Sequence, residues 1–192
     1  MCGIAGIMRL DERPYAHLTD RLEVMNLLQA HRGPDGGGIW FHPRHHLGFG
    51  HRRLSIIDLE SGSQPMTDSA GNTICYNGEI YNYLELRREL ESEYPFRTTS
   101  DTEVILASYQ KWGADCVNHL RGMFSFAIWD EAQQVLFCAR DRFGIKPFYY
   151  AVVDGVFYFS SEGERLLIIF NRFPIFSQHM VNSSHISKED SL

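Results

Sequence analysis

The chain has 192 residues and a formal net charge of −6, which argues against a general nucleic-acid binder. Hydrophobic residues make up 44% of the sequence and charged residues 22%, a composition that can fill the core of a globular domain. No apolar run approaches the roughly 18 residues of a membrane-spanning helix, and no signal-peptide core follows Met1. We therefore expect a cytoplasmic protein without a membrane partner.

The apolar periodicity and the turn signals predict an α+β fold with mostly antiparallel sheets. Helices are expected from about residue 20, over 83–91, from 101 and over 114–120. Strands are expected at 4–10, 39–41, 47–50, 73–76, 123–129, 135–139, 147–153 and 156–160. From residue 161 onward the pattern is lost, which is typical of a tail, and disorder is one interpretation of it.

Cys2 directly follows the initiator Met, and its small side chain lets an aminopeptidase remove Met1. A free α-amine has a pKa near ~7.7–8.0, and a thiol near ~8.5 becomes a strong nucleophile when a neighbour takes its proton. One residue can then supply both nucleophile and base. The alternative is an ordinary buried start to a strand. The other cysteines lie in apolar contexts and are expected in the core, reduced, with no CxxC pair.

Two stretches invite a ligand-binding interpretation that their sequence does not support. The glycines of 33–38 lack the Lys-Ser/Thr that completes a phosphate loop, so a turn is expected. The histidines at 42, 45, 46 and 51 need not converge, and no Cys or carboxylate completes a metal set. We expect a solvated His-rich loop and no metal site.

Three other positions are candidate binding groups, each with a structural alternative. An arginine between apolar runs, such as Arg53, can hold a carboxylate bidentately, or form a surface ion pair. Asn77 and the Gly78 N–H could form an oxyanion hole, although Asn-Gly is commonly a turn. Ser100 and Glu103 form a capping box, which puts Asp101 in a first helical turn. Asp101 could bind an ammonium group, or its negative charge could simply stabilise the N-terminus of the helix.

Seven motifs follow one another along the chain: Cys2-Gly3-Ile4-Ala5-Gly6, His31-Arg32-Gly33-Pro34-Asp35, Arg53-Leu54-Ser55-Ile56-Ile57-Asp58, Tyr76-Asn77-Gly78-Glu79-Ile80-Tyr81-Asn82, Ser100-Asp101-Thr102-Glu103, Arg121-Gly122-Met123-Phe124 and Asp141-Arg142-Phe143-Gly144-Ile145-Lys146-Pro147-Phe148-Tyr149-Tyr150. Taken together, they resemble the class II, N-terminal-nucleophile glutamine amidotransferase domain, in the form found in glutamine-hydrolysing asparagine synthetases. The resemblance covers about residues 2–165 and leaves 166–192 as a divergent tail, for which disorder and truncation are two open interpretations.

The resemblance implies a four-layer αββα sandwich of two mainly antiparallel sheets, and L-glutamine as the substrate. Cys2 is then the nucleophile, and Asn77 with the Gly78 N–H stabilises the oxyanion. Arg53 holds the α-carboxylate of glutamine and Asp101 its α-ammonium. The remaining substrate-binding positions that the resemblance implies are Leu54, Ser55, Ile56, Ile57 and Glu79.

The sequence departs from these synthetases in one respect: it has no Ser-Gly-Gly-x-Asp-Ser loop of an ATP-pyrophosphatase domain. We therefore expect no cofactor in this chain, because ATP and Mg would belong to the missing synthetase domain or to a subunit acting in trans. The chain is then a truncated synthetase or a free-standing glutaminase subunit. Two alternatives stay open: a non-catalytic glutamine-sensing or orphaned partner module, and an amidotransferase for another acceptor.

Overall fold

The computed structural model describes residues 1–54, 62–170 and 184–186. The chain divides into two compact units, Met1–Leu54 with Pro147–Met180 and Ser55–Lys146 with Val181–Leu192. Each unit contains one five-stranded sheet, and all strand pairs in both sheets are antiparallel. None of the helices in the described part of the chain is long and apolar enough to cross a membrane.

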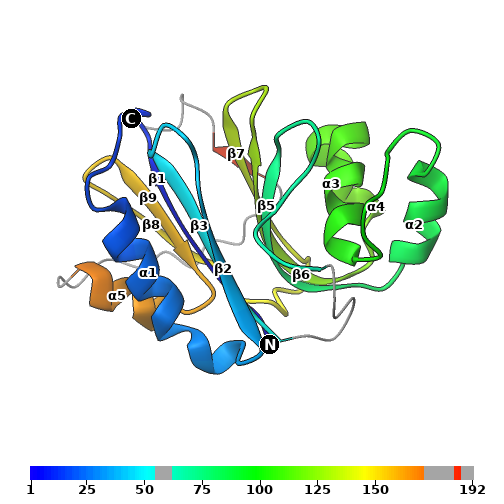
Figure 1. Ribbon diagram of the computed structural model, residues 1–192. Helices are drawn as coiled ribbons and strands as arrows, with labels where there is room; N and C mark the ends of the chain where they lie inside the picture. Colours follow the sequence, from blue (N-terminus) through cyan, green and yellow to red (C-terminus); the bar gives the residue numbers. More distant parts are fainter. Residues whose placement is uncertain (55–61, 171–183, 187–192) are drawn as a thin grey trace. The chain divides into compact units, whose positions relative to one another are not determined.

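The sheet of the first unit has the strand order β2-β3-β1-β9-β8, so the N-terminal strand lies in its middle. One face of this sheet packs against α1 and α5, with Ala5 and Ile7 against Leu22, Met25 and Leu166. Figure 1 shows both helices on that face. The elements are β1 (Gly3–Arg9), α1 (Leu18–Leu28), β2 (Gly36–Phe41), β3 (Leu47–Arg53), β8 (Tyr149–Val153), β9 (Val156–Ser160) and α5 (Gly163–Phe170), with a 3-10 turn at Ala30–Arg32.

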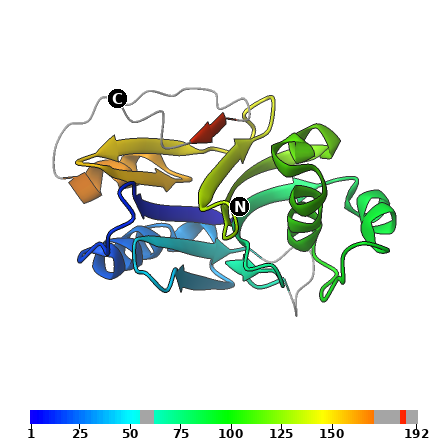
Figure 2. The same cartoon turned by 90° about the horizontal axis from the view of Figure 1, so that it is seen from above.

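The sheet of the second unit has the order β10-β7-β6-β5-β4. Its apolar face, including Ile74, Phe126 and Phe137, packs against Ile105 and Tyr109 of α3. Figure 2 shows α3 beside β5 and β6 from above. The elements are β4 (Met66–Thr67), β5 (Thr73–Ile80), α2 (Tyr83–Leu90), α3 (Asp101–Trp112), α4 (Cys116–His119), β6 (Gly122–Asp130), β7 (Val135–Arg140) and β10 (Ser184–Ile186), with a 3-10 turn at Gly113–Asp115.

Some element boundaries differ from those expected. The strand predicted to end at 76 continues to Ile80, because every residue of β5 finds a partner on β6. The glycines at 36–38, expected in a turn, form the start of β2 opposite Arg53, Arg52 and His51. Helix α5 was not expected, and it crosses the expected domain boundary at residue 165.

The expectation of a solvated histidine loop is wrong. His42, His46 and His51 are at most 4% exposed, and the His42 and His46 rings meet edge to face with centroids 4.5 Å apart. The hairpin between β2 and β3 folds these rings inward, and Trp40 packs against His42. Within the described ranges no group of three or more His, Cys, Asp or Glu side chains could hold a metal ion.

The capping box is only half formed. The Ser100 hydroxyl accepts a hydrogen bond from the Thr102 N–H at 3.1 Å, as an N-cap should. The Glu103 carboxylate instead accepts the backbone N–H groups of Arg97 and Thr98, at 2.9 and 2.7 Å. In a capping box the Glu103 carboxylate would accept the Ser100 N–H, but here it is bound to the preceding loop.

Candidate active site

Cys2 lies immediately before β1, the central strand of the first sheet. Because Gly3 pairs with Arg52, the antiparallel register brings residue 2 beside the end of β3. The Cys2 thiol is 3.3 Å from the Leu54 N–H, which donates to sulfur, and 3.5 Å from the Leu54 carbonyl oxygen. The half-buried sulfur is therefore held by main-chain atoms of one residue.

The other three cysteines are buried core residues, as expected. Burial raises the pKa of the Cys116 thiol to about 12. Burial raises the pKa of the Cys138 thiol well above its usual range, and Cys75 is completely buried. A thiolate is the reactive form of cysteine, so Cys2 is the thiol best suited to act as a nucleophile.

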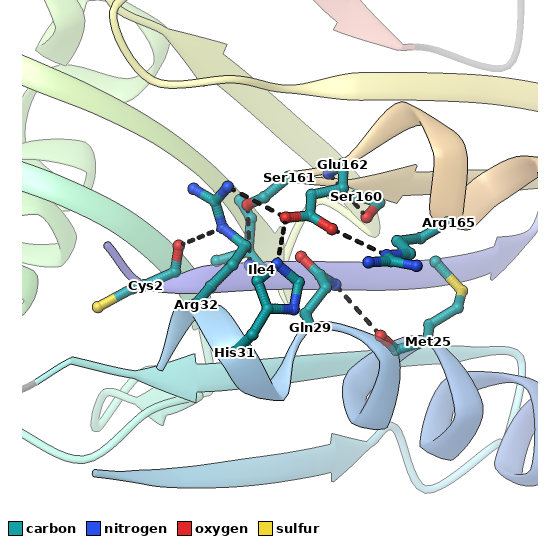
Figure 3. A network of polar contacts seen from close by, with 10 residues as sticks. All are labelled: Cys2, Ile4, Met25, Gln29, His31, Arg32, Ser160, Ser161, Glu162 and Arg165. Atoms are coloured by element: carbon teal, nitrogen blue, oxygen red, sulfur yellow. Dashed lines mark hydrogen bonds and ion pairs between the residues drawn. The ribbon is translucent and has the colours of Figure 1, made fainter. Parts of the chain in front are cut away.

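The main chain of Cys2 has a second partner that the sequence did not indicate. Arg32 donates from Nε to the Cys2 carbonyl oxygen at 3.0 Å, and Figure 3 shows this contact. Arg32 lies in one of the motifs quoted above, but no local pattern gave it a role.

Arg53 ends strand β3, and the preceding 31–35 segment fixes its backbone. The Asp35 N–H donates to the Arg53 carbonyl oxygen at 3.1 Å, and Pro34 forms an isolated bridge with Arg53. A Cβ on Gly33 would lie 2.3 Å from the Arg52 carbonyl carbon, so only glycine allows this approach. Of the neighbouring predicted positions, Leu54 contacts Cys2, whereas Ser55, Ile56 and Ile57 lie outside the described residues.

Asn77 lies within β5 of the second unit, so the interpretation of Asn77-Gly78 as a turn is wrong. Its side chain is 1% exposed, and its Nδ2 has no hydrogen-bond partner among the described residues. A buried donor without an acceptor costs about 1–3 kcal/mol. Such a donor is suited to a ligand oxygen.

The Gly78 N–H points away from β6. The Tyr76 and Ile80 N–H groups, two residues to either side, donate to the Gln64 side chain at 2.7 Å and to Asp101 at 3.1 Å. Because alternate N–H groups of a strand point the same way, the Gly78 N–H is directed toward this same edge of β5. A Cβ on Gly78 would lie 2.3 Å from the Met123 carbonyl oxygen, so the position requires glycine.

Asp101 begins α3 and is 5% exposed. Its Oδ2 accepts both the Tyr76 hydroxyl at 2.8 Å and the Ile80 N–H at 3.1 Å. Burial raises the pKa of Asp101 despite these hydrogen bonds, and the negative charge of the half-buried Glu79 adds to the increase. A cation bound to this carboxylate would oppose both effects.

Within the first unit, the structure thus brings Cys2 and Leu54 into contact and places Arg53 next in the chain. Within the second unit, Asn77, Gly78 and Glu79 are consecutive on β5, and Asp101 bonds to the end of that strand.

A family model described as a glutamine amidotransferase domain matches residues 1–184. The chain belongs to the glutamine amidotransferase family. Its similarity to asparagine synthetase [glutamine-hydrolyzing] 1 of Bacillus subtilis is 47% identity over 180 residues, covering 91% of this chain and 28% of that relative. A putative asparagine synthetase [glutamine-hydrolyzing] 2 of Methanocaldococcus jannaschii is 42% identical over 187 residues, covering 88% of this chain and 35% of the relative. The amidotransferase chain thus spans about a third or less of these relatives.

Two solved structures are similar in fold to this amidotransferase domain. Glutamine phosphoribosylpyrophosphate amidotransferase from B. subtilis has a TM-score of 0.68 at 18% identity, covering 88% of this chain and 44% of its own. An allosteric regulatory enzyme of purine biosynthesis has a TM-score of 0.72 at 20% identity, with 88% and 43% coverage. The predicted α+β class with two mainly antiparallel sheets is confirmed.

Proposed function

We propose that this amidotransferase domain hydrolyses the side-chain amide of L-glutamine to glutamate and ammonia, with Cys2 as the nucleophile. The observation that supports it most directly is the half-buried Cys2 thiol next to the Leu54 N–H, at the start of a strand inside a matched amidotransferase domain. Removal of Met1 frees the α-amine of the same residue, which can take the thiol proton.

These groups suffice for a complete reaction. The thiolate attacks the amide carbon, and Asn77 Nδ2 and the Gly78 N–H stabilise the resulting oxyanion. The protonated α-amine gives its proton to the leaving nitrogen, ammonia departs, and a thioester remains on Cys2. Water, deprotonated by the α-amine, hydrolyses the thioester to glutamate.

The substrate's α-amino-acid end needs one cation and one anion. We assign the α-carboxylate of glutamine to Arg53 and its α-ammonium to Asp101. The resemblance implies Glu79 and residues 54–57 as further substrate-binding positions. The raised pKa of buried Asp101 supports this assignment, because an ammonium group would supply the missing counter-charge.

Intact mass spectrometry tests this proposal. The purified chain should lack Met1 and should form a one-to-one adduct with an electrophilic glutamine analogue at Cys2. It should also release glutamate and ammonia from glutamine. A chain that has lost Met1 yet yields neither the adduct nor glutamate would instead be the non-catalytic module considered above.

The fate of the ammonia is a second part of the proposal. Because the relatives named as asparagine synthetases share 42–47% identity with this chain, we propose that the ammonia serves asparagine formation. An ATP-pyrophosphatase domain or subunit would bind ATP and Mg and activate aspartate; this chain itself needs no cofactor. We also propose a cytoplasmic location, since all four cysteines are unpaired.

Incubation with aspartate, ATP, magnesium and labelled glutamine tests the acceptor. This chain alone should yield glutamate but neither asparagine nor AMP. Production of asparagine or AMP by the chain alone would show that it activates aspartate itself. Another amidated product in the presence of a partner would favour a different acceptor.

A further inference from the structure

The carboxylate of Glu162, which lies between β9 and α5, is bound by three basic side chains. Its Oε1 contacts His31 Nε2 at 2.8 Å and Arg32 Nη1 at 3.4 Å, and its Oε2 accepts from Arg165 Nε at 2.9 Å (Figure 3). Burial alone would raise the pKa of Glu162, but hydrogen bonds from Arg165, His31 and Arg32 hold it below its usual value. Glu162 is therefore an ionised centre of this cluster.

Arg32 links this carboxylate to the nucleophile. Its Nε donates to the Cys2 carbonyl oxygen and its Nη1 to Glu162, whereas its buried Nη2 has no hydrogen-bond partner among the described residues. The side chain of Arg32 is 10% exposed, so water screens these contacts weakly. Within the described ranges, Glu162 is thus one of two acceptors that orient the guanidinium.

The backbone beside Glu162 is fixed to the strand that begins after Cys2. The Ser161 N–H donates to the Ile4 carbonyl oxygen at 2.9 Å, and the Ile4 N–H donates to the Ser161 hydroxyl at 3.0 Å. The Ser160 hydroxyl accepts the Glu162 N–H at 3.1 Å. The main chain next to Glu162 is therefore hydrogen-bonded to Ile4 of β1, which lies two residues after Cys2.

We propose that Glu162 is a positioning residue for the N-terminal nucleophile: it holds Arg32 so that the guanidinium fixes the main chain of Cys2. The inference rests on the proposed function, in which Cys2 supplies both thiol and amine. Once Met1 is removed, no preceding peptide bond restrains residue 2. The Arg32 contact then limits the rotation that would carry thiol and amine away from the amide under attack.

This role predicts which kinetic constant changes. The Glu162 carboxylate bonds to His31, Arg32 and Arg165, none of which is assigned to the substrate's charged groups, so KM should stay near its wild-type value. A loss of alignment at the reacting atoms lowers kcat, and a misplacement of about 1 Å can cost up to ~10²-fold. A cluster that only stabilised the first unit would instead change thermal stability without this selective effect on kcat.

The test compares Glu162→Gln, Glu162→Asp and Glu164→Gln in the full chain lacking Met1. We expect Glu162→Gln to lower kcat for glutamine hydrolysis about tenfold with KM unchanged, and to slow alkylation of Cys2 by iodoacetamide. Glu162→Asp keeps the charge and should restore part of both rates. The exposed Glu164, two residues further on, provides the same loss of charge outside the cluster and should leave both rates unchanged.

Each other outcome contradicts the inference. The inference is overturned if folded Glu162→Gln keeps the wild-type kcat, or if Glu164→Gln loses as much kcat as Glu162→Gln. It is also overturned if Glu162→Gln changes thermal stability and neither rate. If Glu162→Gln does not fold, Arg165→Gln decides, because it removes one contact and should give a smaller loss of kcat. If wild-type chain lacking Met1 releases no glutamate, the proposed function fails as well; if it does and the variants match it, only this inference fails.

Discussion

The nucleophile in the first unit and the proposed binding groups in the second unit are stabilised in opposite ways. Cys2 has hydrogen-bond partners for its thiol and its carbonyl oxygen, both within its own unit. Asn77 buries an amide donor without an acceptor in the described part of the chain, and Asp101 buries a carboxylate whose pKa is raised. The nucleophile is thus held by hydrogen bonds before substrate arrives. The proposed binding groups instead keep an amide donor without a partner among the described residues and a carboxylate whose charge is opposed by burial, both at a cost in stability.

The largest expected effect is at the nucleophile. Cys2→Ala should reduce glutamine hydrolysis to the uncatalysed background, a loss on the order of 10⁴-fold or more, because no other thiol is placed to react. Thermal unfolding should change little, since the sulfur is only half buried. The measurement is glutamate release by the folded variant.

Cys138→Ala is the matched control for Cys2→Ala. It removes a buried thiol from the second sheet, so it should lower the melting temperature and leave kcat unchanged. Turnover above background by clean Cys2→Ala protein would contradict the assignment of Cys2.

Asn77→Ala should lower kcat by about 10²–10³, the usual cost of one oxyanion donor, with little change in KM. Because the Asn77 amide donor has no partner in the part of the chain that the structure describes, its removal should affect stability less than the loss of a bonded asparagine. Steady-state kinetics and thermal unfolding measure the two effects.

Asn72 provides the contrast to Asn77. It donates to Asp68 and accepts the Glu131 N–H, so Asn72→Ala should destabilise the fold while kcat stays unchanged. An Asn77→Ala variant altered only in KM would show that Asn77 binds the ground state rather than the oxyanion.

Asp101→Asn should raise KM for glutamine about 10–100-fold, as expected for loss of a charged hydrogen bond worth ~1.5–3 kcal/mol. It should not destabilise the substrate-free fold at pH 7. The folded-state pKa is raised, so stability is greatest below the ordinary Asp pKa and falls as pH rises through the raised value. The neutral amide of Asp101→Asn removes the cost of burying a charge, and its oxygen can still accept hydrogen bonds from the Tyr76 hydroxyl and the Ile80 N–H.

Asp130→Asn is the control for Asp101→Asn. Asp130 is equally buried and accepts the Tyr109 hydroxyl at 3.0 Å, yet it belongs to no proposed site. The KM of the Asp130→Asn variant for glutamine should equal that of the wild type. An unchanged KM in Asp101→Asn, measured beside it, would remove Asp101 from the binding site.

Tyr76→Phe should have the smallest effect, a rise in KM of about 3–10-fold from the loss of one hydrogen bond. The Tyr76 hydroxyl lowers the pKa of Asp101, so its removal should raise that pKa further. The acid limb of kcat/KM should therefore move to higher pH, as a pH–rate profile would record.

Tyr109→Phe loses the same kind of bond, from a tyrosine hydroxyl to the buried carboxylate of Asp130. It should lower stability without moving the acid limb. Equal profiles for the two tyrosine variants would show that Tyr76 does not act on the binding carboxylate.

The fold was largely predictable because its signals are local. Hairpins such as Tyr149–Val153 with Val156–Ser160 carry their turn residues between two apolar runs, and α3 carries its N-cap. The extension of β5 through Asn77-Gly78 was not predictable from propensity, because pairing with β6 overrides the turn preference of that dipeptide. The buried histidines likewise depend on tertiary packing.

The set of motifs predicts roles for Cys2, Arg53, Asn77 and Asp101, and these roles stay a prediction; each residue alone had a structural alternative. Arg32 and Glu162 were not assigned roles, since they are separated by 130 positions and meet only after β1 and β9 have paired. Long-range contacts of this kind leave no periodic signal in a single sequence.

The contact from Arg32 reaches the carbonyl oxygen of residue 2, and the Leu54 N–H would bond an oxygen as readily as a sulfur. Neither of these two hydrogen bonds therefore requires the reacting atom of residue 2 to be sulfur. The scaffold separates placement from reactivity, so Cys2→Ser should occupy the same position with an intrinsically poorer nucleophile. In such a domain a single codon change at residue 2 can replace the nucleophile over evolution, while the residues that hold its main chain stay the same.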